Sequence, residues 1–287
     1  MLGPDDLVLC SGTLGDAPLR AKIEAAAAAG YTGISLTVDD VERAAADGLA
    51  LAEVRARLAD AGLAVAELDP YLGWLRADAR GALPGADASA MLGRDEAAFF
   101  AIADGVGGTV LNCPHPLPGP VDVDRAAEAF AGVCDRAAEH GLACAIEFLP
   151  WTGIPDAATA AAIASRAGRA NGGIMLDTWH HFRSGGDADA LRALDGALVR
   201  GVQVNDAPRE PHGPPMRETM RERLLPGEGA SDVAAVVAML DAIGSRAPIG
   251  VEVFSDALAA LPPRERALRC ADAARLVLAA ARRTAHR

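Results

Sequence analysis

The chain has 287 residues, of which 51% are hydrophobic and 23% are charged, and its formal net charge is −12. This composition supplies a sizeable apolar core. The acidic balance disfavours nucleic acid as a partner, because binding to a phosphate backbone depends on clustered Lys and Arg. The five cysteines form no CxxC pair, so neither a disulfide framework nor a thiolate zinc site is predicted.

Membrane and secretion signals are not recognisable in the sequence. No apolar run reaches the ~18 residues that suggest a transmembrane helix, and residues 1–6 lack the basic start and apolar stretch of a signal peptide. The sequence therefore predicts a cytoplasmic protein with no membrane partner.

Short apolar runs alternate with alanine-rich segments of helical period along the whole chain. The expected strands lie at 7–10, 34–36, 64–68, 109–112, 143–147, 174–177, 199–203 and 249–252. The expected helices lie at 17–29, 40–60, 88–104, 121–140, 156–167, 187–193, 232–243 and 264–281, with a long loop at 71–87. Eight successive β-then-α units predict an α/β fold, a (β/α)8 TIM barrel that forms a single domain over residues 1–287. No GxGxxG follows the first strand, which argues against a dinucleotide-binding sheet.

One connection is much longer than the others. Residues 204–231 follow the seventh expected strand and are rich in proline, arginine and glutamate. A loop of this length in a compact domain is usually functional or disordered. Because it lies at the end of the barrel where active sites form, we predict a lid with a short helix near 216–223.

Oxygen-bearing side chains stand at the ends of four consecutive expected strands. These residues are Glu147, Asp177, Gln203 and Glu252. The C-terminal ends of barrel strands meet at one mouth, so the four side chains can converge there. Three buried carboxylates repel one another unless a cation lies between them, although each acid could instead pair with an arginine or cap a helix. An all-oxygen ligand set suits Mn²⁺ or Mg²⁺, with Co²⁺ or Zn²⁺ as alternatives.

Several motifs together resemble a known family. They are Ile-Glu-Phe-Leu-Pro at 146–150, Leu-Asp-Thr-Trp-His at 176–180, Val-Gln-Val-Asn-Asp-Ala-Pro-Arg at 202–209, Pro-Gly-Glu-Gly at 226–229 and Val-Glu-Val at 251–253. This combination is similar to the xylose-isomerase-like barrels called sugar phosphate isomerases/epimerases. That group includes hydroxypyruvate isomerase, ketose 3-epimerases, inosose dehydratases and 3-dehydroshikimate dehydratases.

The resemblance implies a role for particular residues. It implies that Glu147, Asp177, Gln203 and Glu252 hold one metal ion, with Gln203 resembling the hydroxypyruvate isomerase version of a position where epimerases usually have histidine. It also implies that His180 and Arg209 contact the substrate. Many epimerases carry a glutamate six residues after the first ligand, where this chain has Gly153.

The activity implied by the resemblance is that of a divalent-metal-dependent isomerase or epimerase of carbohydrate metabolism, acting on a ketose or related polyhydroxy ketone. Proton abstraction would give a metal-stabilised enediolate, with Glu147 and Glu252 as base and acid in an order left open. A lyase that dehydrates a cyclic ketone of the inosose or 3-dehydroshikimate type is the alternative. An endonuclease IV-like nuclease is disfavoured by six scattered histidines, and a non-catalytic binding protein leaves the four potential ligands unexplained.

Other side chains near the expected mouth have competing explanations. His115 and Trp151 could contact the substrate, but a proline-flanked turn and core packing explain them about as well. We expect His181 to be structural and Asp206 to cap the long loop. Glu67, near the end of the third expected strand, could face the mouth or pair with an arginine. The apolar helix faces could mediate a homo-oligomer, but outer barrel helices always carry such a face.

Overall fold

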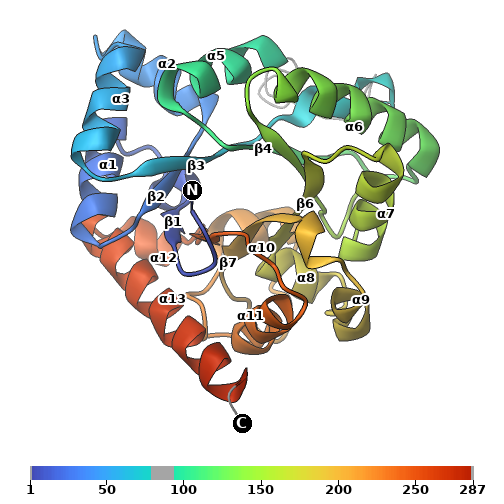
Figure 1. The fold of residues 1–287 in the computed structure, drawn as a ribbon. Helices are drawn as coiled ribbons and strands as arrows, with labels where there is room; N and C mark the ends of the chain where they lie inside the picture. The colour runs from blue at the N-terminus through green and yellow to red at the C-terminus, as the bar shows by residue number, and fades with distance from the viewer. Residues whose placement is uncertain (1, 79–93, 286–287) are drawn as a thin grey trace.

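The computed structural model describes residues 2–78 and 94–285 (Figure 1). The predicted start of the helix at 88–104 and the end of the predicted loop at 71–87 therefore lie outside the described residues. Eight parallel strands pair in chain order, and β8 pairs with β1, which closes the sheet. The predicted (β/α)8 TIM barrel is confirmed.

The strands are short and almost entirely buried. They are β1 Leu7–Leu9, β2 Gly33–Leu36, β3 Ala64–Leu68, β4 Val110–Pro114, β5 Ala143–Glu147, β6 Gly172–Asp177, β7 Val199–Val204 and β8 Ile249–Val251. Parallel strands covered by helices are buried on both faces, which explains their continuous apolar runs. All eight predicted strands are present, with ends within two residues of the predicted ones.

The helices form a ring around this barrel (Figure 1). They are α1 Leu19–Ala28, α2 Val38–Ala46, α3 Leu51–Asp60, α5 Glu96–Val106, α6 Val123–Ala138, α7 Ala157–Ala167, α8 Thr178–Arg183, α9 Ala188–Arg192, α10 Pro215–Arg221, α11 Val233–Ala242, α12 Asp256–Ala259 and α13 Pro263–Ala285. The described residues also form three 3-10 helices, η1 Ser11–Leu14, η2 Leu72–Asp78 and η3 Gly196–Leu198. None of the described helices is both long and apolar enough to cross a membrane.

Aspartates begin several of the helices that follow the strands. The side chains of Asp122, Asp156, Asp187 and Asp232 accept hydrogen bonds from N–H groups of the first turn of α6, α7, α9 and α11. These N–H groups have no partner inside the helix, so an aspartate at the cap stabilises each start by about 1 kcal/mol.

The single helix predicted at 40–60 is wrong, because two helices, α2 and α3, occupy this segment. Gly48 adopts a φ of +82° directly after α2, a conformation that ends helices and that glycine adopts without steric cost. Sequence analysis also missed α8 and α12, which are only 6 and 4 residues long. α8 directly follows β6, and α12 begins five residues after the end of β8.

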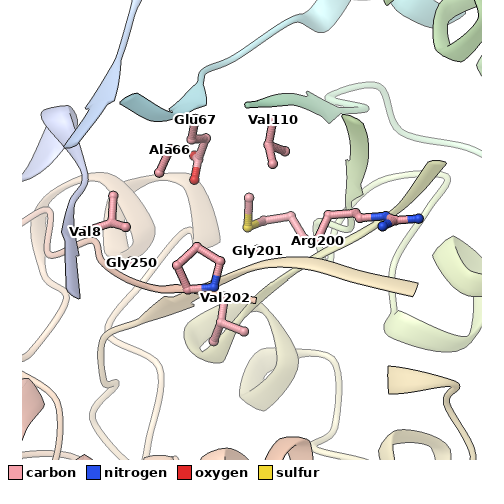
Figure 2. Close-up of a pocket in the computed structure, with 10 residues that line it drawn as sticks. Val8, Ala66, Glu67, Val110, Arg200, Gly201, Val202 and Gly250 are labelled. Carbon is pink, nitrogen blue, oxygen red and sulfur yellow. The ribbon is translucent and has the colours of Figure 1, made fainter. Parts of the chain in front are cut away.

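The interior of the barrel is apolar in its lower part. Val110, Ala145 and Met175 pack together there, and glycines make room for larger neighbours. A Cβ on Gly201 would lie 2.4 Å from Met175 Cε. Below Glu67 a cavity of about 10 Å³ remains (Figure 2), which is space for one water molecule at most. This apolar floor leaves the C-terminal mouth as the place where polar side chains of the strands meet.

Candidate metal centre

The structure brings the four predicted metal ligands to the C-terminal ends of neighbouring strands. Glu147 ends β5, Asp177 ends β6, Gln203 lies in β7 and Glu252 directly follows β8. Asp177 pairs in register with Gln203. All four residues are at most 7% exposed, so their charges and dipoles are largely removed from water.

His180 lies among these residues. Asp177 Oδ1 accepts a hydrogen bond of 2.8 Å from the backbone N–H of His180 and so caps α8. The imidazole Nε2 lies 3.4 Å from Glu147 Oε1. Glu147, Asp177 and His180 thus offer ligand atoms that all lie within 4.8 Å of one another. The histidine predicted to contact substrate is therefore also close enough to contribute a metal ligand.

Arg223 is a buried residue of the site that sequence analysis missed. Its Nη1 lies 2.7 Å from Asp177 Oδ2 and 3.1 Å from Glu252 Oε2. Its side chain is 2% exposed, and Thr219 of α10 accepts further hydrogen bonds from it. The guanidinium therefore supplies one positive charge between two of the predicted ligands.

Asp206 explains how Arg223 reaches the mouth. Its carboxylate accepts hydrogen bonds from the backbone N–H groups of Gly227 and Gly229, and its backbone pairs with Leu224. The second half of the long loop is thereby folded back beside the end of β7. The recognisable signal was the Pro226-Gly-Glu-Gly motif, since Arg223 stands three residues before it. Because the same loop contains other arginines, the sequence did not single out Arg223.

The other three residues predicted to contact the substrate lie in three different environments. Arg209 is exposed and lines a surface pocket together with Glu228 and Leu276 of α13, away from the four predicted ligands. Trp151 is half-buried, with its ring centroid 5.7 Å from that of His180. His115 is buried and packs against Trp74, at 6.2 Å between ring centroids.

The helix predicted within 204–231 is present as α10, and α8 holds it in place. Glu218 of α10 is 1% exposed and accepts hydrogen bonds from Arg183 Nε at 2.7 Å and Trp179 Nε1 at 3.2 Å. A buried carboxylate with several donors is firmly held. The role of this loop as a lid stays a prediction.

Two further acids lie on the β3 side of the mouth. Burial and then the nearby Asp69 raise the pKa of Glu67 well above its usual value, and burial and then Glu147 raise the pKa of Asp69 to about 7. Asn112 Nδ2 donates to both Asp69 Oδ1 at 2.8 Å and Glu147 Oε2 at 2.7 Å. This amide nitrogen therefore bridges two carboxylates and holds one oxygen of Glu147.

The pKa values of two predicted ligands move in opposite directions. Burial raises the pKa of Glu252 well above its usual value despite the opposing effect of Arg223. For Asp177, burial acts in the same upward direction, but Arg223, His180 and hydrogen bonds outweigh it and lower the pKa. Asp177 is thus the more firmly ionised group, and Glu252 holds a proton more readily.

The charges and donors of the site fit a divalent metal ion. Glu147, Asp177 and Glu252 contribute three negative charges when ionised, and Arg223 contributes one positive charge, which leaves two negative charges to balance. Glu252, like Glu67 and Asp69, has a raised pKa in the metal-free site, and a bound cation would favour its ionised form. Within the described part of the chain, Gln203 Oε1 and His180 Nδ1 are buried without a hydrogen-bond partner. Buried polar atoms of this kind are unusual unless a ligand completes the site.

Comparison with known proteins gives the family. Residues 23–275 match the xylose isomerase-like TIM barrel family, and the chain belongs to it. The 3-dehydroshikimate dehydratase of Pseudomonas aeruginosa is 30% identical over 270 residues, which cover 91% of this chain and 39% of the relative. The inosose isomerase of Bacillus subtilis is 28% identical over 129 residues, or 44% of this chain and 45% of the relative. The chain thus spans about two fifths of the length of its dehydratase relatives.

Solved structures support the same fold. The IOLI protein with a bound zinc atom matches 96% of this chain and 98% of its own, with a TM-score of 0.82 and 18% identity. L-ribulose 3-epimerase matches 100% of this chain and 97% of its own, with a TM-score of 0.72 and 20% identity. At these identities the likeness concerns the fold, and the named relatives include enzymes of more than one reaction class.

Proposed function

We propose that the chain is a divalent-metal-dependent enzyme that removes a proton next to the carbonyl of a polyhydroxylated ketone and eliminates water from it, as a 3-dehydroshikimate dehydratase does. The observation that carries the metal dependence is the cluster of Glu147, Asp177 and His180, whose ligand atoms all lie within 4.8 Å of one another. The dehydratase relatives match 91% of the chain, whereas the inosose isomerases match less than half of it, which supports dehydration over isomerisation.

Glu147, Asp177, Gln203 and Glu252 would hold the metal, with His180 close enough to join them. When bound, the metal would polarise the substrate carbonyl and stabilise negative charge on its oxygen. Glu147 Oε2 is held by Asn112, so Oε1 is the oxygen that faces His180 and can accept the carbon-bound proton. Glu252 is the second carboxyl group at the mouth, beside Arg223, and would deliver a proton to the departing hydroxyl, which leaves as water.

Hydrogen-bond donors beside these carboxylates would orient the substrate. Arg223 and His180 are buried beside Glu147 and Glu252, where they can donate hydrogen bonds to substrate oxygens. The half-buried ring of Trp151 lies against His180 and can form an apolar wall. In a water-poor pocket such fixed donors strengthen the interaction with developing negative charge.

Isomerisation of a cyclic or open polyhydroxy ketone is the second candidate, favoured by the inosose isomerase relatives. The same proton abstraction serves both reactions, and they differ in whether a β-hydroxyl leaves. Ketose 3-epimerisation receives less support, because the glutamate of many epimerases has no space here. A Cβ on Gly153 would lie 2.4 Å from the carbonyl oxygen of Gly119.

Two measurements test this proposal. Elemental analysis of wild type, Asp177→Asn and the exposed-cap control Asp187→Asn should give about one divalent ion per chain in the first and third proteins and much less in the second. Incubation with 3-dehydroshikimate, inososes and ketoses in D₂O should give loss of water from a cyclic ketone. Deuterium exchange into a ketose without loss of water would support the isomerase instead. Equal metal content in Asp177→Asn and wild type would exclude the proposed site.

A further inference from the structure

Glu67 is a buried acid that the proposed chemistry does not use. It lies near the end of β3 and is 5% exposed. Its Oε1 accepts a hydrogen bond of 2.8 Å from Gln203 Nε2, a residue 136 positions later in the chain and across the barrel. This is the contact that joins a predicted metal ligand on β7 to the opposite side of the barrel.

The hydrogen bond determines which end of the Gln203 amide faces the mouth. A glutamine side chain has one donor end and one acceptor end. Because Gln203 uses its NH₂ end to donate to Glu67 Oε1, its carbonyl oxygen is directed elsewhere. That oxygen is buried and has no hydrogen-bond partner in the described part of the chain. Leaving a buried acceptor unpaired destabilises the fold, and a bound cation would offset this cost.

The surroundings of Glu67 leave this contact without competition. Glu67 lines the small cavity inside the barrel, together with Val8, Ala66, Val110 and Met175 (Figure 2). These four side chains are apolar, and the guanidinium of Arg200, which also lines the cavity, donates to the carbonyl oxygens of Ala170 and Gly172. Gln203 is the hydrogen-bond partner of Glu67 within residues 2–78 and 94–285. Burying an acid beside apolar side chains destabilises the fold. The position of Glu67 next to a predicted metal ligand therefore suggests that it acts on that ligand.

We propose that Glu67 is a positioning residue that presents Gln203 Oε1 to the metal ion. The inference rests on the proposed function and extends it from the ligands to the group that orients one of them. In metalloproteins, carboxylates that hydrogen-bond a histidine ligand fix its orientation and increase its basicity. Glu67 does the same for an amide: it selects the oxygen and polarises the carbonyl, which favours cations that prefer oxygen ligands.

The first test measures metal affinity directly. The metal-stripped full-length protein is titrated with Mn²⁺ by calorimetry, for wild type, Glu67→Met and the control Val8→Ala from the same cavity. Glu67→Met should weaken binding roughly 10–100-fold, as loss of a group behind a metal ligand does. Val8→Ala changes only packing and should keep its affinity within about twofold of wild type, and Glu67→Gln, which retains an acceptor, should recover part of the loss.

A double-mutant cycle shows whether Glu67 acts through Gln203. In the Gln203→Leu background, Glu67→Met should cause no further loss of Mn²⁺ affinity. An equal loss in both backgrounds, or unchanged affinity of Glu67→Met in the presence of Gln203, would overturn the inference while leaving the metal site intact. Absence of Mn²⁺, Mg²⁺, Co²⁺ and Zn²⁺ binding by the wild type would instead overturn the proposed function and this inference with it.

A second measurement uses the wild-type protein, so its result does not depend on whether a variant folds. Gln203 is the only glutamine in the chain, and labelling glutamine with ¹³C and ¹⁵N gives a single side-chain amide signal by NMR. Saturation with diamagnetic Mg²⁺ should shift the carbonyl carbon while the NH₂ protons stay slow to exchange with water. A carbonyl signal that does not respond to saturating Mg²⁺ would overturn the inference.

Discussion

Arg223 and Asp177 form an ion pair of 2.7 Å in which both side chains are at most 2% exposed. The same guanidinium nitrogen lies 3.1 Å from Glu252. The mouth of the barrel therefore contains a fixed organic cation, brought there by the long loop after β7. When this loop folds, it places the positive charge of Arg223 beside the carboxylates of the site.

Replacement of Arg223 should affect both stability and activity. Arg223→Met removes the buried cation beside Asp177 and Glu252, and breaking a buried ion pair typically costs about 3–5 kcal/mol. We expect a lower melting temperature of the metal-free protein, partly restored by Mn²⁺, and at least a roughly 100-fold lower kcat/KM. The exposed Arg217→Met in the same loop is the control for calorimetry and kinetics. Equal melting temperatures and kcat/KM values for the two variants would show that the buried ion pairs of Arg223 support neither stability nor activity.

Asp69 should make stability depend on pH. Its pKa is raised to about 7, by burial first and then by Glu147, whereas an unfolded Asp titrates near ~4. The folded state thus keeps this proton to higher pH, so Asp69 destabilises the fold progressively from about pH 4 to about pH 7 and fully above that.

Asp69→Asn removes this titration and keeps an acceptor for Asn112. In urea unfolding without metal, the variant and wild type should be about equally stable near pH 4. Above about pH 7 the variant should be more stable by roughly 1–2 kcal/mol, a reduced figure because Asp69 is partly exposed and shares protons with its neighbours. A stability difference that does not change with pH would contradict the assignment.

Thr13 fixes the backbone on both sides of Glu252. Its hydroxyl donates to the carbonyl of Val251 at 2.9 Å and accepts from the N–H of Val253 at 3.0 Å. Thr13→Val keeps the shape but loses both hydrogen bonds, so Glu252 should shift and kcat should fall on the order of 10-fold, since small displacements of catalytic groups are costly. Thr13→Ser should retain most of the activity. Equal kcat values for the Val and Ser variants would refute this role.

Gly153 should tolerate no side chain. A Cβ there would lie 2.4 Å from both the Gly119 oxygen and Val121 Cγ2, and relief of such overlap costs about 1–3 kcal/mol. Gly153→Ala should therefore unfold at lower temperature. Gly132→Ala at a half-buried position of helix α6 serves as the opposite control, because alanine is the better helix former and only the flexible end of Arg136 lies near, at 3.3 Å. A neutral Gly153→Ala would show that the 119–121 segment can move aside.

The amino-acid sequence by itself determined the barrel and the strands that carry the predicted ligands. Buried parallel strands are short apolar runs, and their C-terminal ends share one mouth, so Glu147, Asp177, Gln203 and Glu252 could be grouped from order along the chain alone. The period of the apolar residues did not reveal the break at Gly48, since the alanine-rich pattern continues across it.

Only the tertiary structure decided which other groups join the mouth. Arg223, rather than Arg209, lies beside Asp177 because Asp206 folds the long loop back onto β7. The orientation of the Gln203 amide depends on Glu67, which is distant in sequence. Local patterns record the period and the ends of each element, but a hydrogen bond between residues 136 positions apart depends on the closed barrel that brings them together.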